Sequence, residues 1–222
     1  MAFKYPQFLV NTDWLAEHLN DTDIRVLDCT AFNMPDGNGG IRAESGHESW
    51  EAEHIPGAGH ADLVTDLSDE SSAFRYMLPP VSQFAKAMSG YGVGAGTRVV
   101  LYDSTSGSWA TRIWWMLRVF GFDDAYILNG GLHKWKLENR PLSTEAPAYP
   151  PAIFHAKPRA GLMADQNEVL SAIKDGATCV INALSSDQHL GKGGANYGRA
   201  GRIADSVNVP AGDLMDTVTH AY

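Results

Sequence analysis

Short, nearly continuous hydrophobic runs alternate along this chain with longer segments whose hydrophobic residues recur at helical spacing. Three runs predict buried strands, namely DIRVLDC (23–29), TRVVLYD (97–103) and DAYILNG (124–130). Helical spacing predicts helices over 13–19, 83–92, 109–120 and 132–140. Strands that are apolar on both faces and alternate with helices are typical of a parallel sheet covered on both sides. The pattern therefore predicts an α/β fold.

Residues that start and stop elements support this assignment. Asn11-Thr12-Asp13 offers N-caps for the first helix, Ser82 can cap the second, and Gly121 ends the third. Pro56-Gly57 predicts a sharp turn, whereas the polar, glycine-rich stretch 33–48 shows no element pattern. We expect one complete α/β domain over residues 1–142. Residues 143–159 follow as a stiff, proline-rich linker.

The pattern then restarts within 160–222. QNEVLSAIKDGATCVINA repeats TDWLAEHLNDTDIRVLDC at an offset of 154 residues, and GRIADSVNVPAGDL repeats EHIPGAGHADL at an offset of 148. Tyr222 corresponds to about position 74 of the first copy. We therefore expect residues 160–222 to be an incomplete second copy that lacks the later helices and strands. A half-domain exposes apolar faces, so we expect it to pack against the first domain or a neighbouring chain.

YDSTSGSWATR (102–112) is the sharpest candidate for chemistry. This loop of small residues follows a buried strand and opens a helix, so its successive backbone N–H groups and the helix dipole favour a negative centre. A cysteine at the first position would become a stabilised thiolate. That position is Asp103, which can satisfy the N–H donors as a fixed anion without doing chemistry. Ser104, Gly107 and Arg112 complete the loop.

Other motifs favour structural readings. GYGVGAG (90–96) is preceded by a helix and followed by a strand, the reverse of a dinucleotide site, and GKGG (191–194) lacks the spacing of a P-loop. The serines of the loop lack a G-x-S-x-G context. His47, His54 and His60 fit no zinc spacing, and we expect His54 and His60 to satisfy turns and backbone groups. Cys29 and Cys179 are interpreted as buried structural thiols.

Four motifs in one order, HIPGA (54–58), VVLYD with its loop, WWMLRVFG and LNGGLHKW (128–135), resemble the tandem rhodaneses, the thiosulfate and 3-mercaptopyruvate sulfurtransferase family. This resemblance implies a rhodanese-like first domain that is catalytically silent. It also implies a second domain whose loop cysteine carries sulfur as a persulfide. The nucleophile would then lie beyond Tyr222, near position 251, and this chain would be inactive.

The second copy departs from the family pattern at several positions. Its strand ends Asn182-Ala183-Leu184 where the family has Asp-x-Arg, and Gln188 replaces a common substrate-binding arginine. Arg199 and Arg202 can supply positive charge there instead, or be ordinary surface arginines. The choice between thiosulfate and 3-mercaptopyruvate stays open.

Composition limits the partners. The net charge is −9 without any Lys/Arg run, which argues against nucleic-acid and anionic-membrane binding. No apolar leader or membrane span is visible, so we expect a soluble, cytoplasmic protein without cofactor or metal. The resemblance implies a small anionic sulfur donor and a thiol or cyanide acceptor. The competing hypotheses are a non-catalytic binding or regulatory module and, more distantly, a phosphatase relative, which also needs a loop cysteine.

Overall fold

The computed structural model describes residues 5–37, 40–193 and 199–222, which divide into two compact units. The first unit comprises Met1–Phe32, Ala43–Arg159 and Thr217–Tyr222, and the second comprises Asn33–Arg42 and Ala160–Asp216. Within the described residues, no helix is long and apolar enough to cross a membrane. The same residues contain no group of three or more His, Cys, Asp or Glu side chains that could hold a metal ion.

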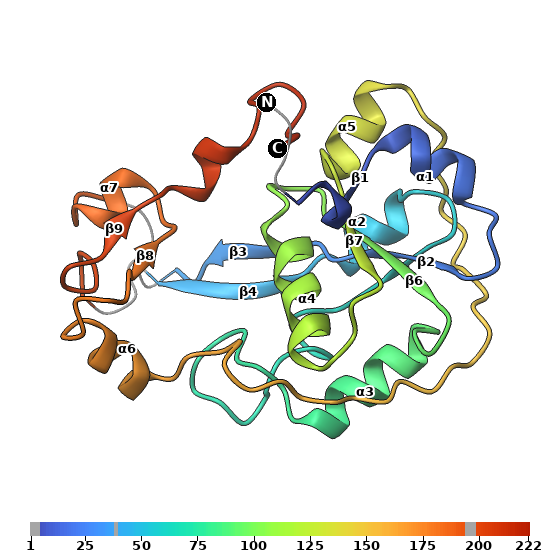
Figure 1. Ribbon diagram of the computed structural model, residues 1–222. Helices are drawn as coiled ribbons and strands as arrows, with labels where there is room; N and C mark the ends of the chain where they lie inside the picture. The colour runs from blue at the N-terminus through green and yellow to red at the C-terminus, as the bar shows by residue number, and fades with distance from the viewer. Residues whose placement is uncertain (1–4, 38–39, 194–198) are drawn as a thin grey trace. The chain divides into compact units, whose positions relative to one another are not determined.

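A five-stranded sheet forms the centre of the first unit (Figure 1). Its strands are β1 (Leu9–Val10), β2 (Ile24–Asp28), β5 (Ala58–His60), β6 (Arg98–Tyr102) and β7 (Ala125–Leu128), in the order β1-β7-β6-β2-β5. All four neighbouring pairs are parallel. Asp28 is in register with His60 on one side and with Tyr102 on the other. The carboxyl ends of three adjacent strands therefore meet at one edge of the sheet.

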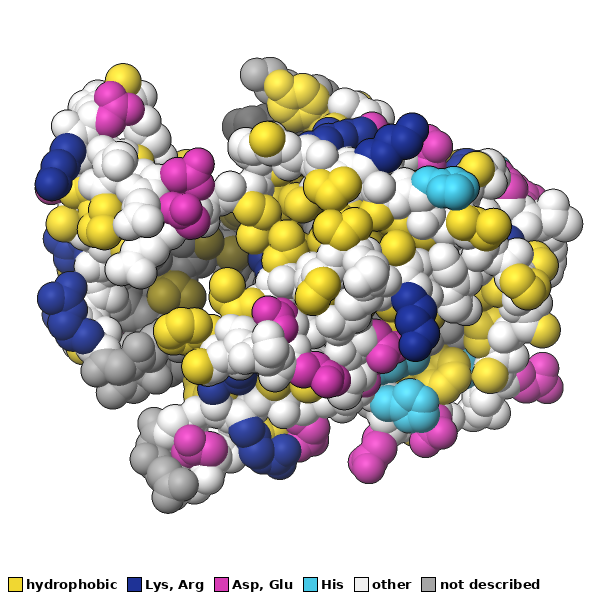
Figure 2. Space-filling model, turned by 90° about the horizontal axis from the view of Figure 1, so that it is seen from below, with side chains coloured by type: hydrophobic (Ala, Val, Ile, Leu, Met, Phe, Trp, Pro, Cys, Tyr) yellow, Lys and Arg dark blue, Asp and Glu magenta, His cyan; other side chains and the backbone are white. Residues whose placement is uncertain are grey.

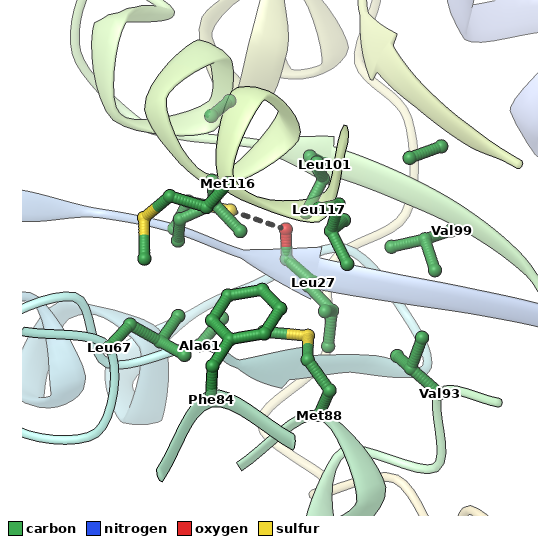
Figure 3. Packing of buried hydrophobic residues seen from close by; sticks show 14 of the residues in the cluster. Leu27, Ala61, Leu67, Phe84, Met88, Val93, Val99, Leu101, Met116 and Leu117 are labelled. Carbon is green, nitrogen blue, oxygen red and sulfur yellow. Dashed lines mark hydrogen bonds between the residues drawn. The ribbon is translucent and has the colours of Figure 1, made fainter. Parts of the chain in front are cut away.

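Helices cover both faces of this sheet, as the apolar strands predict. On one face lie α3 (Val81–Gly90) and α4 (Ser108–Val119), and on the other lie α1 (Thr12–His18) and α5 (Gly131–Leu137). Figure 3 shows Phe84 and Met88 of α3 and Met116 and Leu117 of α4 packed around Leu27. Leu27 and its contacts are fully buried, so this layer is the main core of the unit.

The local signals for the helix ends hold in most places. Asn11 caps α1 by accepting a hydrogen bond from the Trp14 N–H at 2.7 Å, and Gly121 follows α4 with φ +89°. The expectation for Ser82 is wrong. Because α3 begins at Val81 with Pro80 at the cap position, Ser82 already lies inside the first turn and cannot cap it.

The glycine-rich stretch 33–48 is more regular than its sequence suggests. β3 (Ala31–Pro35) and β4 (Ile41–Ser45) form a two-stranded sheet, and the short helix α2 (His47–Ala52) follows. The side chains of both strands are half-buried or exposed apart from Ala31, so no apolar run marks them in the sequence.

The proline-rich segment packs along the first unit. Residues 146–158 of this segment form neither helix nor strand. Elsewhere in the first unit, a short 3₁₀ helix, Pro6–Phe8, precedes β1. The Val26 N–H donates to the Tyr149 hydroxyl at 2.9 Å, and the Lys157 N–H donates to the Phe120 carbonyl at 2.7 Å. Phe154 is buried in the core beside Phe84. The segment is extended, as prolines favour, and is anchored at several points.

The second unit repeats local geometry from the first. It contains α6 (Gln166–Ala172), β8 (Ile181–Asn182), α7 (Ser186–His189), β9 (Val207–Asn208) and the 3₁₀ helix Ala211–Leu214. Helix α6 follows α1 at the offset of 154, and each helix has a polar cap, Asp165 and Asn11. Strands β8 and β9 pair in parallel with Ile181 opposite Val207. Their counterparts at offsets of 154 and 148, Leu27 and Gly59, pair in the same way.

The second unit differs from the first in burial. Among its described residues no hydrophobic side chain is buried, and Ile181 is 60% exposed where Leu27 is fully buried. Cys179 is exposed as well, so the expectation of a buried thiol is wrong for this cysteine. The physical reason is that β8 has only two residues and Cys179 precedes it, outside any packed layer.

Candidate functional site

The candidate site lies at the carboxyl end of β6, where the sequence predicts an anion-binding loop. Asp103 follows the last residue of β6 and is 2% exposed. Gly107 adopts φ +73° immediately before α4, which turns the chain so that the first N–H groups of the helix face back toward the strand end. The loop is thus held between a buried strand and a helix N-terminus.

The Asp103 carboxylate fills this loop. Its Oδ1 accepts hydrogen bonds from the Thr105 N–H at 2.8 Å, the Thr105 hydroxyl at 2.9 Å and the Gly107 N–H at 3.0 Å. Its Oδ2 accepts from the N–H groups of Trp109 and Ala110, both at 3.0 Å. Five donors therefore converge on one buried negative group, as charge-assisted hydrogen bonds and the helix dipole favour.

The neighbouring strand β2 supports the loop from one side. The Ser104 N–H donates to the Thr30 hydroxyl at 3.0 Å, and the Thr30 hydroxyl in turn donates to the Asp28 carboxylate at 2.5 Å. Burial raises the pKa of Asp28, although its hydrogen bonds with Thr30 and Tyr102 oppose that shift. Sequence patterns gave no signal for Thr30, because a single threonine after a strand has no motif of its own.

The turn after β7 supports the loop from the other side. The Leu132 N–H donates to the Asp103 backbone carbonyl at 3.2 Å, and a Cβ at Gly131 would lie 2.6 Å from that oxygen. Gly131 is therefore required for the close approach of the two backbones. This explains why the glycine pair of LNGGLHKW accompanies the loop.

The segment Thr217–Tyr222 also lies against the loop within the first unit. His220 Nδ1 is 3.0 Å from the Thr105 carbonyl oxygen, and the Tyr222 N–H donates to Asn129 Oδ1 at 2.8 Å. Asp103 lines a cavity of about 10 Å³, and its walls also include Gly107, His220 and Tyr222. This volume is about that of one water-sized sphere, so the cavity is too small for a substrate.

The two cysteines differ in burial. Cys29 is fully buried, and its pKa is raised by that burial and by the negative charges of Asp28 and Asp103. A thiol whose pKa is raised stays protonated and unreactive at neutral pH. Cys179 is exposed and belongs to the second unit, outside the Asp103 loop. No cysteine among the described residues stands within the loop.

His54 and His60 both contact backbone groups of the first unit. His54 is fully buried, with Nδ1 2.6 Å from the Trp50 carbonyl and Nε2 3.1 Å from the Glu145 carbonyl, so it satisfies backbone groups. His60 makes a hydrogen bond with the Thr30 backbone, and burial lowers its pKa.

The glycine motif GYGVGAG (90–96) forms turns, with φ +73° at Gly92 and +79° at Gly96. The last glycine of GKGG, Gly194, lies outside the described residues.

Of the arginines that the sequence singles out, Arg112 belongs to the loop, whereas Arg199 and Arg202 belong to the second unit. Arg112 Nη2 donates to the Tyr76 carbonyl at 2.8 Å, and desolvation lowers the pKa of its half-buried guanidinium. Arg202 Nη1 lies 3.4 Å from the His189 carbonyl in the second unit, and Arg199 is exposed there. The hydrogen bonds to the Asp103 carboxylate come from backbone N–H groups and the Thr105 hydroxyl.

A shallow groove of about 740 Å³ lies elsewhere on the first unit, beside the start of α3. Val81, Ala85, Phe154 and Lys157 are among its lining residues. In the view from below, Figure 2 shows hydrophobic side chains interspersed with charged and polar ones, including Lys/Arg and His. The residues that line the groove include no carboxylate, whereas the Asp103 loop brings several N–H donors together around one buried carboxylate, so the loop is the better candidate.

This fold and loop define a class of protein: an α/β domain with an anion-binding loop between its central parallel strand and the following helix. The family model described as "Rhodanese-like domain" matches residues 11–138. The chain therefore belongs to the rhodanese family.

Sulfurtransferases and a sulfur carrier protein are similar to nearly the whole chain. The sulfur carrier protein TtuD of Thermus thermophilus is 31% identical over 223 residues, which cover 95% of this chain and 72% of that protein. The thiosulfate sulfurtransferase of Rattus norvegicus is 32% identical over 211 residues, with coverage of 91% and 68%. The crystal structure of SseA from Escherichia coli, described under 3-mercaptopyruvate sulfotransferases, is 30% identical with a TM-score of 0.77. It covers 95% of this chain and 78% of that chain.

Proposed function

We propose that the protein containing this chain is a sulfurtransferase that moves sulfane sulfur from thiosulfate or 3-mercaptopyruvate to a thiol or cyanide acceptor. Membership of the rhodanese family carries this proposal, together with the names of the relatives. The chemistry uses a cysteine thiolate. Its sulfur attacks the outer sulfur of thiosulfate, a new S–S bond forms, and sulfite leaves with the electron pair of the broken bond. Cyanide then attacks the outer persulfide sulfur and releases thiocyanate and the thiolate.

We further propose that residues 1–142 are a catalytically silent domain, that 143–159 link it to a second copy, and that the nucleophile lies beyond residue 222. The Asp103 carboxylate supports the first point, because it occupies the loop position where a nucleophilic thiolate would need the same N–H donors. The matching offsets of α6 and of the β8–β9 pair support the second. In this proposal Arg199 and Arg202 of the second copy help to attract the anionic donor in a cytoplasmic enzyme.

One assay tests where the nucleophile lies. The 222-residue chain is incubated with thiosulfate and cyanide, and thiocyanate formation is measured against the full-length gene product. We expect no turnover from the 222-residue chain. Turnover that is lost in Cys179→Ser or Cys29→Ser would place the nucleophile inside this chain and refute the proposal.

A non-catalytic binding module remains the second candidate, because the one loop of this type in the described residues lacks a thiol. The coding sequence after position 222 separates the two candidates. A Cys-x-x-Gly loop followed by a helix, about 148 residues after Asp103, supports the enzyme. A stop codon after Tyr222 supports the module.

A further inference from the structure

We propose that the Asp103 loop (residues 103–112) is a docking site for the segment Thr217–Tyr222, and that holding this segment is the loop's own function. The proposal concerns a loop without a nucleophile and is independent of the sulfur chemistry above. The segment follows the second copy in sequence but belongs to the first unit. Its contacts come from three places in that unit: the loop, the residue after β7, and α5.

Hydrogen bonds hold the segment at three points. The Tyr222 N–H donates to Asn129 Oδ1 at 2.8 Å. Each of two backbone carbonyls lies within hydrogen-bond distance of a histidine ring nitrogen: Thr105 O is 3.0 Å from His220 Nδ1, and Val218 O is 2.9 Å from His133 Nε2. Because a carbonyl oxygen can only accept, each ring nitrogen carries the proton. These bonds run in both directions between the segment and the first domain.

Ring stacking fixes the segment between those bonds. The rings of His133 and His220 stack with centroids 4.0 Å apart and an interplanar angle of 14°. His220 has a backbone φ of +54°, a left-handed conformation that a non-glycine residue adopts at a cost in free energy. Such a conformation persists where surrounding contacts compensate for it, and the stack and the Thr105 hydrogen bond are those contacts.

The loop has a shape that suits this segment. Gly107 has no side chain, and a Cβ built there would lie 2.9 Å from the Tyr222 hydroxyl and 3.6 Å from the ring carbon that bears it. The Asp103 carboxylate fixes both Thr105 and Gly107 through their N–H groups, at 2.8 Å and 3.0 Å. Asp103 therefore holds in place the carbonyl that meets His220 and the glycine that admits Tyr222.

The main test compares Gly107→Ala with Gly96→Ala in the 222-residue chain. Both glycines have positive φ, +73° and +79°, so both substitutions strain the backbone. A Cβ at Gly96 meets nothing within 4 Å, whereas one at Gly107 meets Tyr222. Hydrogen exchange of the Tyr222 amide is followed by NMR, and the amides of β6 report global opening.

We expect Gly107→Ala to accelerate exchange of the Tyr222 amide about tenfold relative to the β6 amides, which corresponds to about 1.4 kcal/mol of lost docking free energy. Gly96→Ala should leave that ratio unchanged. Equal effects of the two variants, or none from either, would overturn the proposal.

A second pair of variants leaves the loop backbone intact. Asn129→Ala removes the acceptor of the Tyr222 amide, and His133→Ala removes the stacking partner of His220. Each should accelerate exchange of the Tyr222 amide, and His133→Ala should also change the chemical shifts of the His220 ring protons. If the Tyr222 amide and the His220 ring are unaffected by both substitutions while the fold is retained, the segment is not docked in solution and the proposal fails.

Discussion

At the scale of single residues, we expect the Asp103 carboxylate to stabilise the folded loop through its hydrogen bonds. Asp103→Asn keeps the shape but removes the charge, and it turns one acceptor oxygen into an N–H₂ group that faces backbone donors. Since lost charge-assisted bonds and buried unpaired donors each cost 1–3 kcal/mol, we expect a loss of about 2–3 kcal/mol in the free energy of unfolding. Urea denaturation followed by tryptophan fluorescence measures this change.

Asp69→Asn is the matched control for that measurement. Asp69 also accepts from a backbone N–H and a hydroxyl, both of Ser71, but does so at the surface, where water can replace either bond. Its substitution should change the free energy of unfolding much less. Equal losses for the two variants would mean that the convergence of donors on Asp103 has no special energetic weight.

The lowered pKa of His60 predicts that the stability of the fold depends on pH. Burial lowers its pKa in the folded state below the ordinary value of 6.5, although Asp62 and Asp28 oppose that shift. The unfolded chain therefore binds more protons just below pH 6.5, so this group's contribution to stability is full above that pH and is lost as the pH falls. His60→Asn should flatten the decline in the free energy of unfolding between pH 7 and pH 5. Parallel curves for the two proteins would contradict this expectation.

At the scale of secondary-structure elements, apolar runs are what the sequence reveals best. Strands β2 and β6 are almost entirely buried, so most of their residues are hydrophobic. Helix α4 has hydrophobic positions on one face and a glycine after its end. The β3–β4 pair has no such run because its side chains are mostly half-buried or exposed, which leaves no contrast in hydrophobicity. A strand that is buried on both faces can thus be predicted from its sequence more readily than a strand that is paired but exposed.

The site was only partly predictable for a related reason. Residues 102–112 are recognisable because small side chains lie between a predicted strand and a predicted helix. The anion-binding loop and the Asp103 carboxylate could therefore be inferred from adjacent positions in the sequence. Thr30 contacts that loop from the end of another strand, and His220 and Tyr222 reach it from about 115 residues further along the chain. Asn129 and His133 contact the segment that carries His220 and Tyr222. Contacts at such separation depend on the tertiary fold and leave no local pattern.

At the scale of the whole molecule, the same sequence pattern occurs twice but is buried only once. Leu27 and Ile181 occupy equivalent places in β2 and β8 with the same strand register, yet their exposures are 0% and 60%. Leu27 is covered by α3 and α4 and paired on both sides of its strand. The difference in burial follows from the helices and neighbouring strands that cover β2, which β8 lacks among the described residues of its unit.

This difference predicts unequal costs for equivalent substitutions. Leu27→Ala should lower the free energy of unfolding of the first unit by about 2–5 kcal/mol, because it leaves a cavity in a packed core. Ile181→Ala in the 222-residue chain should change it by less than about 0.5 kcal/mol, since an exposed side chain loses little contact. Urea denaturation of both variants measures the two values. A large loss from Ile181→Ala would contradict this prediction and show that β8 is covered in solution.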